Sequence, residues 1–327
     1  MKLVSVVDNP VPIATEVSRI RAADGVGLRV ARFEARVERP LGTVTIYQGR
    51  AEFIEKWAEP IAELLDRGFA VVAFDWRGQG ASDRALEDPR KGHVRRFRHY
   101  ARDVEAIAAQ VLPKCPGPHF VLAHSMGAGI ALDLARHGRL PAERLVALSP
   151  MIALAAIDRP RVARAYIRAS RLALLGGTYV PGGGETSVMT RPFPGNPLTS
   201  DERRYVRNAG IAAEVKEWAV GAPTVAWLDE AWSLMRTLQA PRAALDIRMP
   251  VLIVAGGADR VVSTPAAERF AAWLKTGPAL VIPGARHELL NESDAIRARV
   301  WGAFDAFVPG TAGAGLSKDR QRAVSLR

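Results

Sequence analysis

One serine in the sequence stands where its hydroxyl could act as a nucleophile. Ser125 follows an apolar run, residues 120–123, that predicts a buried strand, and a stretch of small residues with helical spacing comes after it. A serine on so tight a strand-to-helix turn exposes its hydroxyl at the carboxyl end of the strand, beside a helix N-terminus that favours negative charge. The pattern is Gly-x-Ser-x-Gly, except that Ala123 stands at the first glycine. An ordinary turn also fits these five residues, so the catalytic interpretation depends on suitable partner residues elsewhere in the chain.

A serine hydroxyl needs a base within hydrogen-bond reach, and that base needs an orienting group. His287 lies in a loop directly after the apolar run 279–282, and Asp259 lies directly after the apolar run 251–255. Because parallel strands end at the same edge of a sheet, we expect both side chains near Ser125. The order serine, aspartate, histidine along the chain is that of a known catalytic triad. The other acidic candidates, none of which follows a core strand, are Asp229, Asp246 and Asp294.

An attacked carbonyl develops negative charge, which two fixed backbone N–H groups can hold. The residue after the nucleophile, Met126, would supply one of them. Arg50, which follows Gly49 in the loop after the predicted strand 41–47, would supply the other. Losing such a donor typically raises a barrier by about 3–4 kcal/mol. Gly49 could also be a simple turn glycine.

The remaining polar residues near strand ends fit structural roles better. Asp75 and Arg77 follow the apolar run 69–74 and are predicted to hold a glycine-rich loop. His124 belongs to the serine turn itself, where we expect it to contribute backbone. The other histidines predicted to be non-catalytic are His93, His99, His119 and His137.

Composition describes a globular protein with ample core. Of the 327 residues, 48% are hydrophobic and 24% charged, and the single cysteine excludes an internal disulfide or a multi-cysteine metal cluster. The first eight residues lack the apolar run of a signal peptide, and no stretch of about 18–20 uncharged apolar residues occurs. These features predict a cytoplasmic protein. The formal net charge of +11 comes from arginines spread along the whole chain, which fits a solvated surface.

Strands and helices alternate in two parts of the chain. The pattern predicts an α/β fold with a mostly parallel central sheet and helices on both faces, formed by residues 1–151 and 246–308. Residues 152–245 carry helical patches but no clear strand, which predicts a helical cap inserted into that core. Residues 309–327 predict a disordered basic tail.

Several boundaries are specific enough to test. Residues 13–19 and 28–34 predict a hairpin, and residues 53–66 predict one continuous helix. The tetrapeptide 199–202 fits a capping box that opens a helix through Val206.

The chain resembles serine hydrolases of the α/β-hydrolase fold, in the monoacylglycerol lipase and lysophospholipase branch. This branch is the serine aminopeptidase S33-like group, and the bacterial lysophospholipase L2 type is most similar. The resemblance implies a triad that hydrolyses carboxylic esters of lipids without metal or organic cofactor. Two departures are Ala123 at the elbow and Gly49-Arg50 in place of His-Gly-x-Gly. The matching stretches are Gly49-Arg50-x-Glu52 with Lys56-Trp57, Asp75-Trp76-Arg77-Gly78-Gln79-Gly80-x-Ser82, His124-Ser125-Met126-Gly127, Asn196-x-Leu198-Thr199-Ser200-Asp201, Pro223-Thr224-x-x-Trp227, and the Asp259 and His287 loops.

The cap of this architecture covers the serine and shapes the substrate pocket. Trp218, Trp227 and Trp232 are therefore candidate substrate-binding residues, although such residues also serve as a cap's own core. A nucleic-acid partner is not predicted, because no recognised motif or interleaved stacking aromatics occur. Four arginines at helical spacing would share one face, which is either solvated or rests on anionic lipid headgroups; they are Arg161, Arg164, Arg168 and Arg171.

The sequence thus predicts a serine hydrolase that cleaves lysophospholipids or monoacylglycerols through an acyl-enzyme. An esterase of small esters, or a peptidase of short substrates, is the alternative among enzymes. A non-catalytic binding protein with a hydrolase fold is the alternative from another class.

Overall fold

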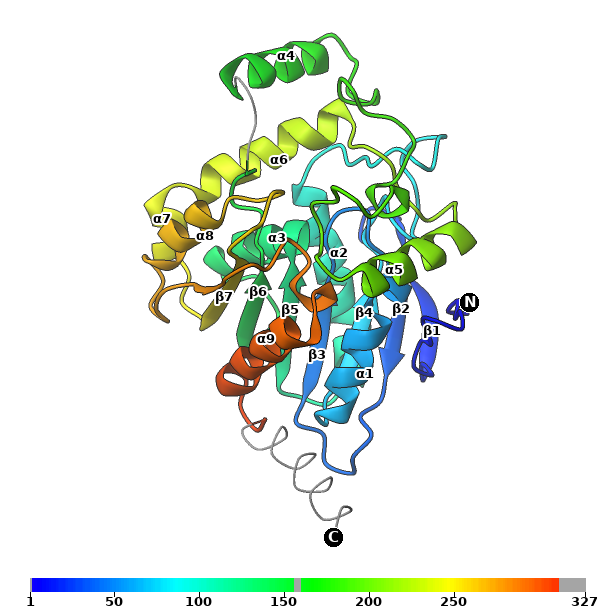
Figure 1. The fold of residues 1–327 in the computed structure, drawn as a ribbon, viewed down its shortest axis with the longest axis vertical. Helices are drawn as coiled ribbons and strands as arrows, with labels where there is room; N and C mark the ends of the chain where they lie inside the picture. Colours follow the sequence, from blue (N-terminus) through cyan, green and yellow to red (C-terminus); the bar gives the residue numbers. More distant parts are fainter. Residues whose placement is uncertain (1, 156–159, 312–327) are drawn as a thin grey trace.

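The computed structural model describes residues 2–155 and 160–311 of the chain. One eight-stranded sheet runs through it in the order β1-β2-β4-β3-β5-β6-β7-β8 (Figure 1). The first two strands pair antiparallel with their neighbours, and every pairing from β4 to β8 is parallel. The strands are β1 Glu16–Arg21, β2 Gly27–Phe33, β3 Thr43–Tyr47, β4 Ala70–Phe74, β5 His119–His124, β6 Arg144–Leu148, β7 Val251–Gly256 and β8 Leu280–Ile282.

Helices cover both faces of this sheet, as the unbroken apolar strands require. One face packs against α2 (Arg98–Gln110), α3 (Ser125–Arg136) and α8 (Thr264–Ala271). The other face packs against α1 (Ala58–Asp66) and α9 (Asp294–Phe307). Strands β3 and β4 are buried along their whole length, as expected for the middle of a sheet covered twice.

A helical segment lies between β6 and β7. It contains α4 (Pro160–Leu172), α5 (Glu202–Glu214), α6 (Val225–Leu238) and α7 (Pro241–Leu245). Helix α6 rests on α3, and α4 rests on α6, so the segment is stacked above one end of the sheet (Figure 1). No strand occurs between β6 and β7 in the described residues, only isolated bridges. The boundaries 152 and 245 of a separate cap domain stay a prediction.

Two predicted helix boundaries are wrong, and the first is wrong for a local reason. Residues 53–66 are not one helix, because a short 3₁₀ turn, Ile54–Trp57, precedes α1. Pro60 has no N–H and its ring would clash with the carbonyl of Lys56 in a continuous helix, so it is tolerated only in the first turn of α1. The predicted hairpin forms, with β1 shifted a few residues toward the C-terminus.

The helix predicted from the capping box begins later and runs further, from Glu202 to Glu214. Its N-cap is Asp201, whose carboxylate accepts a hydrogen bond from the Arg204 N–H at 2.9 Å. The Thr199 hydroxyl instead donates to the Asn291 carbonyl at 2.7 Å. As an acceptor, the Thr199 hydroxyl binds the Asp201 N–H at 3.0 Å, and the cap of the helix is Asp201, two residues after the predicted one. Of the predicted disordered tail, residues 312–327 lie outside the described residues.

An ion-pair cluster fastens α5 to the core. The Glu59 carboxylate on α1 receives Arg204 and Arg207 from α5, at 2.7 and 2.6 Å, and Arg297 from α9 at 3.2 Å. Burial alone would raise the pKa of Glu59, but the hydrogen bond from Arg204 and the nearby arginine charges lower it to about 2. The carboxylate is therefore bound far more strongly in its ionised form.

We expect Glu59→Gln to lower the free energy of unfolding at pH 7 by about 2–3 kcal/mol. Because the pKa of Glu59 is lower in the folded chain than its ordinary value of 4.5, its stabilisation is present above pH 4.5 and disappears as the pH falls through about 2. Urea unfolding across this pH range should show the difference between wild type and variant shrinking toward acid. Glu105→Gln, which breaks a half-exposed pair with Arg139, is the control and should change stability by less than about 1 kcal/mol. A pH-independent difference for Glu59→Gln would contradict the expectation.

Candidate active site

The turn between β5 and α3 holds Ser125 in an unusual backbone conformation. Its φ is 50°, in the left-handed region that residues other than glycine rarely adopt. Two positions later, a side chain on Gly127 would collide with the carbonyl oxygens of Tyr47 and Gln48 at the end of β3. The close approach of α3 to β3 therefore enforces the sharp turn, and Ser125 is presented at the carboxyl edge of the sheet. Ala123, at the position of the usual first glycine, is completely buried.

Three loops at this edge bring the predicted triad together. The Ser125 hydroxyl lies 2.9 Å from Nε2 of His287, and Nδ1 of His287 lies 2.8 Å from Oδ2 of Asp259. The other carboxylate oxygen of Asp259 accepts the N–H groups of Val261 and Val262, at 2.7 and 3.0 Å. Both oxygens of the acid are thus used, and the line serine, histidine, aspartate is hydrogen-bonded throughout.

The electrostatics of this line set the proton positions. Burial alone would raise the pKa of Asp259, but the hydrogen bond from His287 and the two backbone N–H groups lower it overall. An ionised carboxylate can only accept, so Nδ1 of His287 carries the proton that faces Asp259. The lone pair of Nε2 then faces the Ser125 hydroxyl, as a general base requires.

A glutamine side chain orients the Gly49–Arg50 peptide in the loop after β3. Nε2 of Gln79 donates to the Gly49 carbonyl at 3.0 Å, and its Oε1 accepts the Ala51 N–H at 3.0 Å. Because the peptide unit is planar and trans, the Arg50 N–H points opposite to the Gly49 carbonyl and so away from Gln79. Ala51 has a φ of 62°, and the glutamine supports this costly conformation. The loop thus carries a fixed Arg50 N–H, although its role as an oxyanion donor with Met126 stays a prediction.

A cavity of about 410 Å³ opens beside the serine. Ser125, His287, Arg50 and Met126 all line it, together with side chains from the segment between β6 and β7. This segment contributes mainly apolar surface, from Leu154, Val188, Met189, Leu198, Trp227 and Leu228. A cavity of this size and lining accommodates a small, largely apolar ligand.

Only one of the three candidate tryptophans lines this cavity. Trp227 does, whereas Trp218 stacks edge-on with Phe53 and lies 4.2 Å below the Arg29 guanidinium. Trp232 is buried in the core beneath α4, with Arg164 over its ring at 5.8 Å. Trp218 and Trp232 are therefore placed as structural residues, and the prediction that they line the pocket is wrong. Trp218 is half-buried in the turn after α5 and Trp232 is buried on α6, and both contact residues far away in the chain, which spacing along the chain does not reveal.

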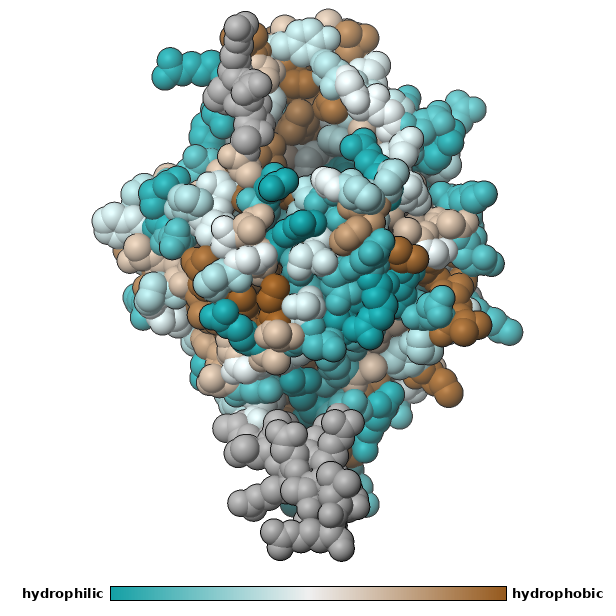
Figure 2. All heavy atoms as spheres, viewed as in Figure 1, coloured by the Kyte–Doolittle hydropathy of each residue, from teal (hydrophilic) through white to brown (hydrophobic). Residues whose placement is uncertain are grey.

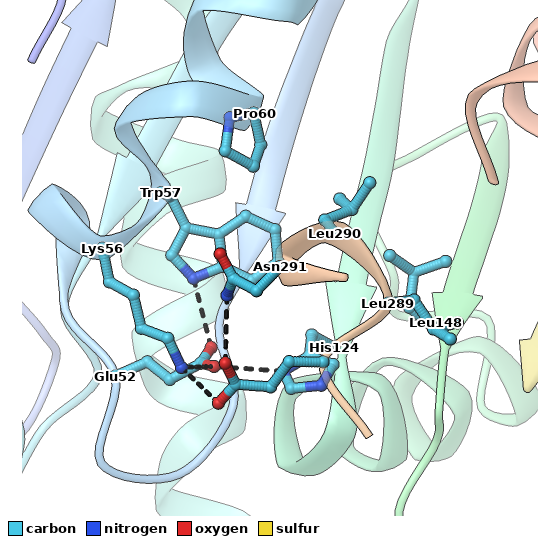
Figure 3. Close-up of a pocket in the computed structure, with 10 residues that line it drawn as sticks. Glu52, Lys56, Trp57, Pro60, His124, Leu148, Leu289, Leu290 and Asn291 are labelled. Carbon is cyan, nitrogen blue, oxygen red and sulfur yellow. Dashed lines mark hydrogen bonds and ion pairs between the residues drawn. The ribbon is translucent and has the colours of Figure 1, made fainter. Parts of the chain in front are cut away.

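A cluster of buried charges lies behind the catalytic loops (Figure 3). The Glu52 carboxylate accepts the Gly49 N–H at 2.6 Å and the Trp57 indole N–H at 3.1 Å, and it pairs with Lys56 at 2.7 Å. Lys56 also pairs with Glu288, next to His287, at 2.6 Å. These charges satisfy one another in the interior, and they connect the loop after β3 with the histidine loop.

The side chain of His124 belongs to this cluster, so the prediction that it contributes only backbone is wrong. Its Nδ1 lies 3.2 Å from Glu52, and its Nε2 lies 3.3 Å from the carbonyl oxygen of His287. Burial alone would lower the pKa of His124, but the charge of Glu52 raises it overall. The four-residue spacing of Glu52 and Lys56 was a local signal for their pair, whereas nothing local points to Glu288.

Asp75 and Arg77 have the structural roles expected of them. Asp75 accepts the N–H groups of Ile54 and Ala81 and pairs with the buried Arg29. Arg77 pairs with Asp24 and Asp103. Within the described residues, no group of three or more histidine, cysteine or acidic side chains is arranged to hold a metal ion.

Comparison with known proteins shows the family to which the chain belongs. The family model described as serine aminopeptidase, S33 matches residues 38–294. The chain belongs to the S33 family. Lysophospholipase L2 of Escherichia coli (strain K12) is 35% identical over 286 residues, with 84% of this chain and 82% of the relative covered. Phospholipase YtpA of Bacillus subtilis is 25% identical over 230 residues, covering 69% and 79% of the two chains.

Solved structures confirm the predicted α/β-hydrolase fold for this S33 protein. A monoglyceride lipase from Saccharomyces cerevisiae, solved with a substrate analog, matches with a TM-score of 0.72 and 17% identity, over 92% of this chain and 97% of that one. A thermostable carboxyl esterase from Bacillus coagulans, solved with glycerol, matches with a TM-score of 0.73 and 19% identity, over 92% and 99%.

The geometry of Gln79 predicts a specific kinetic defect. In Gln79→Glu the side chain can still accept from Ala51 but can no longer donate to the Gly49 carbonyl, so the Gly49–Arg50 peptide loses its orientation. We expect kcat for a p-nitrophenyl ester to fall about 100-fold, the size of a lost oxyanion donor, with a KM within a few-fold of wild type. Gln110→Glu, which removes a similar amide-to-carbonyl bond on the exposed surface, is the control. An unchanged kcat in a folded Gln79→Glu protein would show that the Arg50 N–H takes no part.

Proposed function

We propose that the protein hydrolyses carboxylic esters of lipids, with lysophospholipids as the first substrate class, through an acyl-enzyme. The single observation that carries this proposal is the hydrogen-bonded line Ser125–His287–Asp259 at the wall of a largely apolar cavity. The 35% identity with a lysophospholipase L2 over most of both chains supports the choice of substrate.

In the proposed reaction, Ser125 attacks the ester carbonyl while Nε2 of His287 takes its proton. Asp259 keeps the imidazole oriented and stabilises its charged form. The N–H groups of Arg50 and Met126 hold the oxyanion of the tetrahedral intermediate. His287 then protonates the leaving alcohol, and a water molecule activated by the same histidine releases the fatty acid.

The charges around the cavity favour an ester substrate over a peptide with a free amino terminus. An α-ammonium group would need an unpaired carboxylate, and the carboxylates that line the cavity are Glu52 and Glu288. Both already pair with Lys56, which lies within 2.7 Å of each, so neither is free to bind an α-ammonium group. The apolar lining instead suits an acyl chain.

Removing the nucleophile tests the proposal directly. Ser125→Ala should lose labelling by a fluorophosphonate probe, and its kcat for lysophosphatidylcholine should fall by about 10⁴-fold or more. Ser233→Ala, an exposed serine on α6, is the matched control and should behave as wild type. Wild-type rates on p-nitrophenyl esters of increasing chain length separate a lipid hydrolase from an esterase of small esters. Labelling of Ser125→Ala equal to that of wild type would contradict the assignment of the nucleophile. Binding of lysophosphatidylcholine to wild type without turnover would favour a non-catalytic binding protein.

We also propose that the outer surface of α4 contacts anionic membranes. No described helix has the length and apolar character needed to cross a bilayer, so any contact of these helices is peripheral.

Arg171 does not share the solvent-facing side with the other three arginines, because it pairs with Asp229 and Glu230 of α6. The exposed side instead combines Arg161 and Arg168 with apolar groups. Figure 2 shows hydrophobic surface around a hollow in this part of the molecule. The exposed apolar side chains on and just after α4 are Val162, Tyr166, Leu172, Leu174 and Leu175.

This surface predicts salt-sensitive binding to charged vesicles. Wild type should sediment with phosphatidylglycerol vesicles and much less with phosphatidylcholine vesicles. The double variant Arg161→Gln/Arg168→Gln should bind the charged vesicles at least about tenfold more weakly, since each charge contributes about 1 kcal/mol near such a surface. Arg36→Gln/Arg139→Gln, exposed arginines of the core, is the charge-matched control. Equal losses in both double variants would assign the binding to net charge instead of α4. A cytoplasmic location of the protein stays a prediction.

A further inference from the structure

The guanidinium of Arg50 is a half-buried charge that pairs with no carboxylate among the described residues. Its Nη2 donates to the Gly221 carbonyl, and its Cζ lies 5.4 Å from the centre of the Trp227 ring. Its Nε is buried and has no hydrogen-bond partner among the described residues. The side chain lines the same cavity as Ser125. One backbone carbonyl and one aromatic ring are thus its partners in the described part of the chain.

Other buried or half-buried cations of the protein have more polar partners than Arg50. Arg29 pairs with Glu55 and Asp75, and Lys56 pairs with Glu52 and Glu288. Arg84, which also lacks a carboxylate, donates to four backbone carbonyls instead. Arg50 has neither arrangement, although burying an uncompensated charge is costly.

A guanidinium with so few partners favours an anionic ligand. Burial lowers the pKa of Arg50 to about 10, so the guanidinium is still charged at neutral pH. Lys56 pairs with both carboxylates at the cavity wall, so neither of them faces an incoming anion as an unpaired charge. A guanidinium offers N–H groups in a planar fork that fits phosphate oxygens, and a surface with little water strengthens that contact.

We propose that the Arg50 guanidinium, stacked near Trp227, binds the phosphate of the lysophospholipid headgroup. The inference rests on the proposed function and narrows it: the enzyme selects phosphate-bearing lipid esters over neutral monoacylglycerols. The Arg50 backbone would serve the oxyanion while its side chain serves the headgroup, so one residue would couple the chemistry to the choice of substrate.

Binding of unreactive ether lipids tests this without relying on turnover. Wild type is titrated by calorimetry with 1-O-octyl lysophosphatidylcholine and with 1-O-octylglycerol, both below the concentration at which they form micelles. We expect the phosphate lipid to bind about 10- to 100-fold more tightly, as a hydrogen-bonded charge pair would provide. Equal affinities would overturn the proposal even if the enzyme hydrolyses the corresponding esters, octanoyl lysophosphatidylcholine and monooctanoylglycerol. If wild type hydrolyses neither ester, the proposed function fails, and the ether lipids still decide whether the phosphate subsite exists.

Variants assign the effect to Arg50. Because a displaced backbone N–H would slow both esters by the same factor, the readout is the ratio of kcat/KM for octanoyl lysophosphatidylcholine to that for monooctanoylglycerol. Arg50→Gln should lower this ratio about 10- to 100-fold. Arg260→Gln removes an exposed charge from the same cavity wall and should change it by about fivefold or less. A larger effect in Arg260→Gln, or an unchanged ratio in Arg50→Gln, would overturn the assignment.

Two further measurements complete the test. If Arg50→Gln does not fold, the affinities of the two ether lipids for wild type decide alone. Inorganic phosphate is added as a competitor to separate a lipid headgroup from free phosphate. We expect millimolar phosphate to leave the bound ether lipid in place, since it lacks the acyl chain. Displacement by inorganic phosphate with equal affinity would make this a free-phosphate site and overturn the proposal.

Discussion

The active-site loops depend on the contacts of one buried group, the Glu52 carboxylate. It receives the Gly49 N–H from the loop after β3 and the charge of Lys56, and it lies 3.2 Å from His124 in the serine turn. Lys56 extends the connection to Glu288, beside His287. A buried carboxylate is costly unless its oxygens are used, and here several donors converge on it. The loop that presents Arg50, the turn that presents Ser125 and the loop that presents His287 therefore share one anchor (Figure 3).

The parallel sheet explains why the triad could be predicted from the sequence. Each of Ser125, Asp259 and His287 follows an apolar run directly, and strands of one parallel sheet end at one edge. Local pattern and chain order were therefore enough to bring together side chains from three distant segments. The alternation of strands and helices likewise predicted the core, and most strand boundaries fall within two or three residues of those expected.

The features that sequence reasoning missed depend on contacts between distant residues. The Thr199 hydroxyl donates to a carbonyl 92 residues away and accepts the Asp201 N–H, and the cap lies on Asp201, later than a local capping rule predicts. Lys56 and Glu288, 232 residues apart, form a buried pair that no periodic pattern reveals. The aromatic content of the segment predicts Trp218 and Trp232 as pocket residues, but Trp218 lies in the turn after α5 against Phe53, and Trp232 faces the core from α6. Packing alone decides which aromatic side chains reach the cavity. Gln79 was visible as part of a motif, yet its function in the Gly49–Arg50 loop follows from geometry alone.

The contrast between local pattern and long-range contact also applies to the site: the groups proposed for the chemistry follow the sheet, whereas the group proposed for selectivity depends on distant contacts. The groups proposed to react stand on the sheet edge and would serve any ester that reaches Ser125. Arg50 differs because its side chain bridges two parts of the chain: it leaves the loop after β3 and ends against Gly221 and Trp227 of the inserted segment. Any movement of that segment changes the surroundings of the guanidinium, whereas Glu52 and its partners keep the backbone of the loop in place. Substrate choice can therefore vary with the inserted helices while the catalytic geometry is preserved.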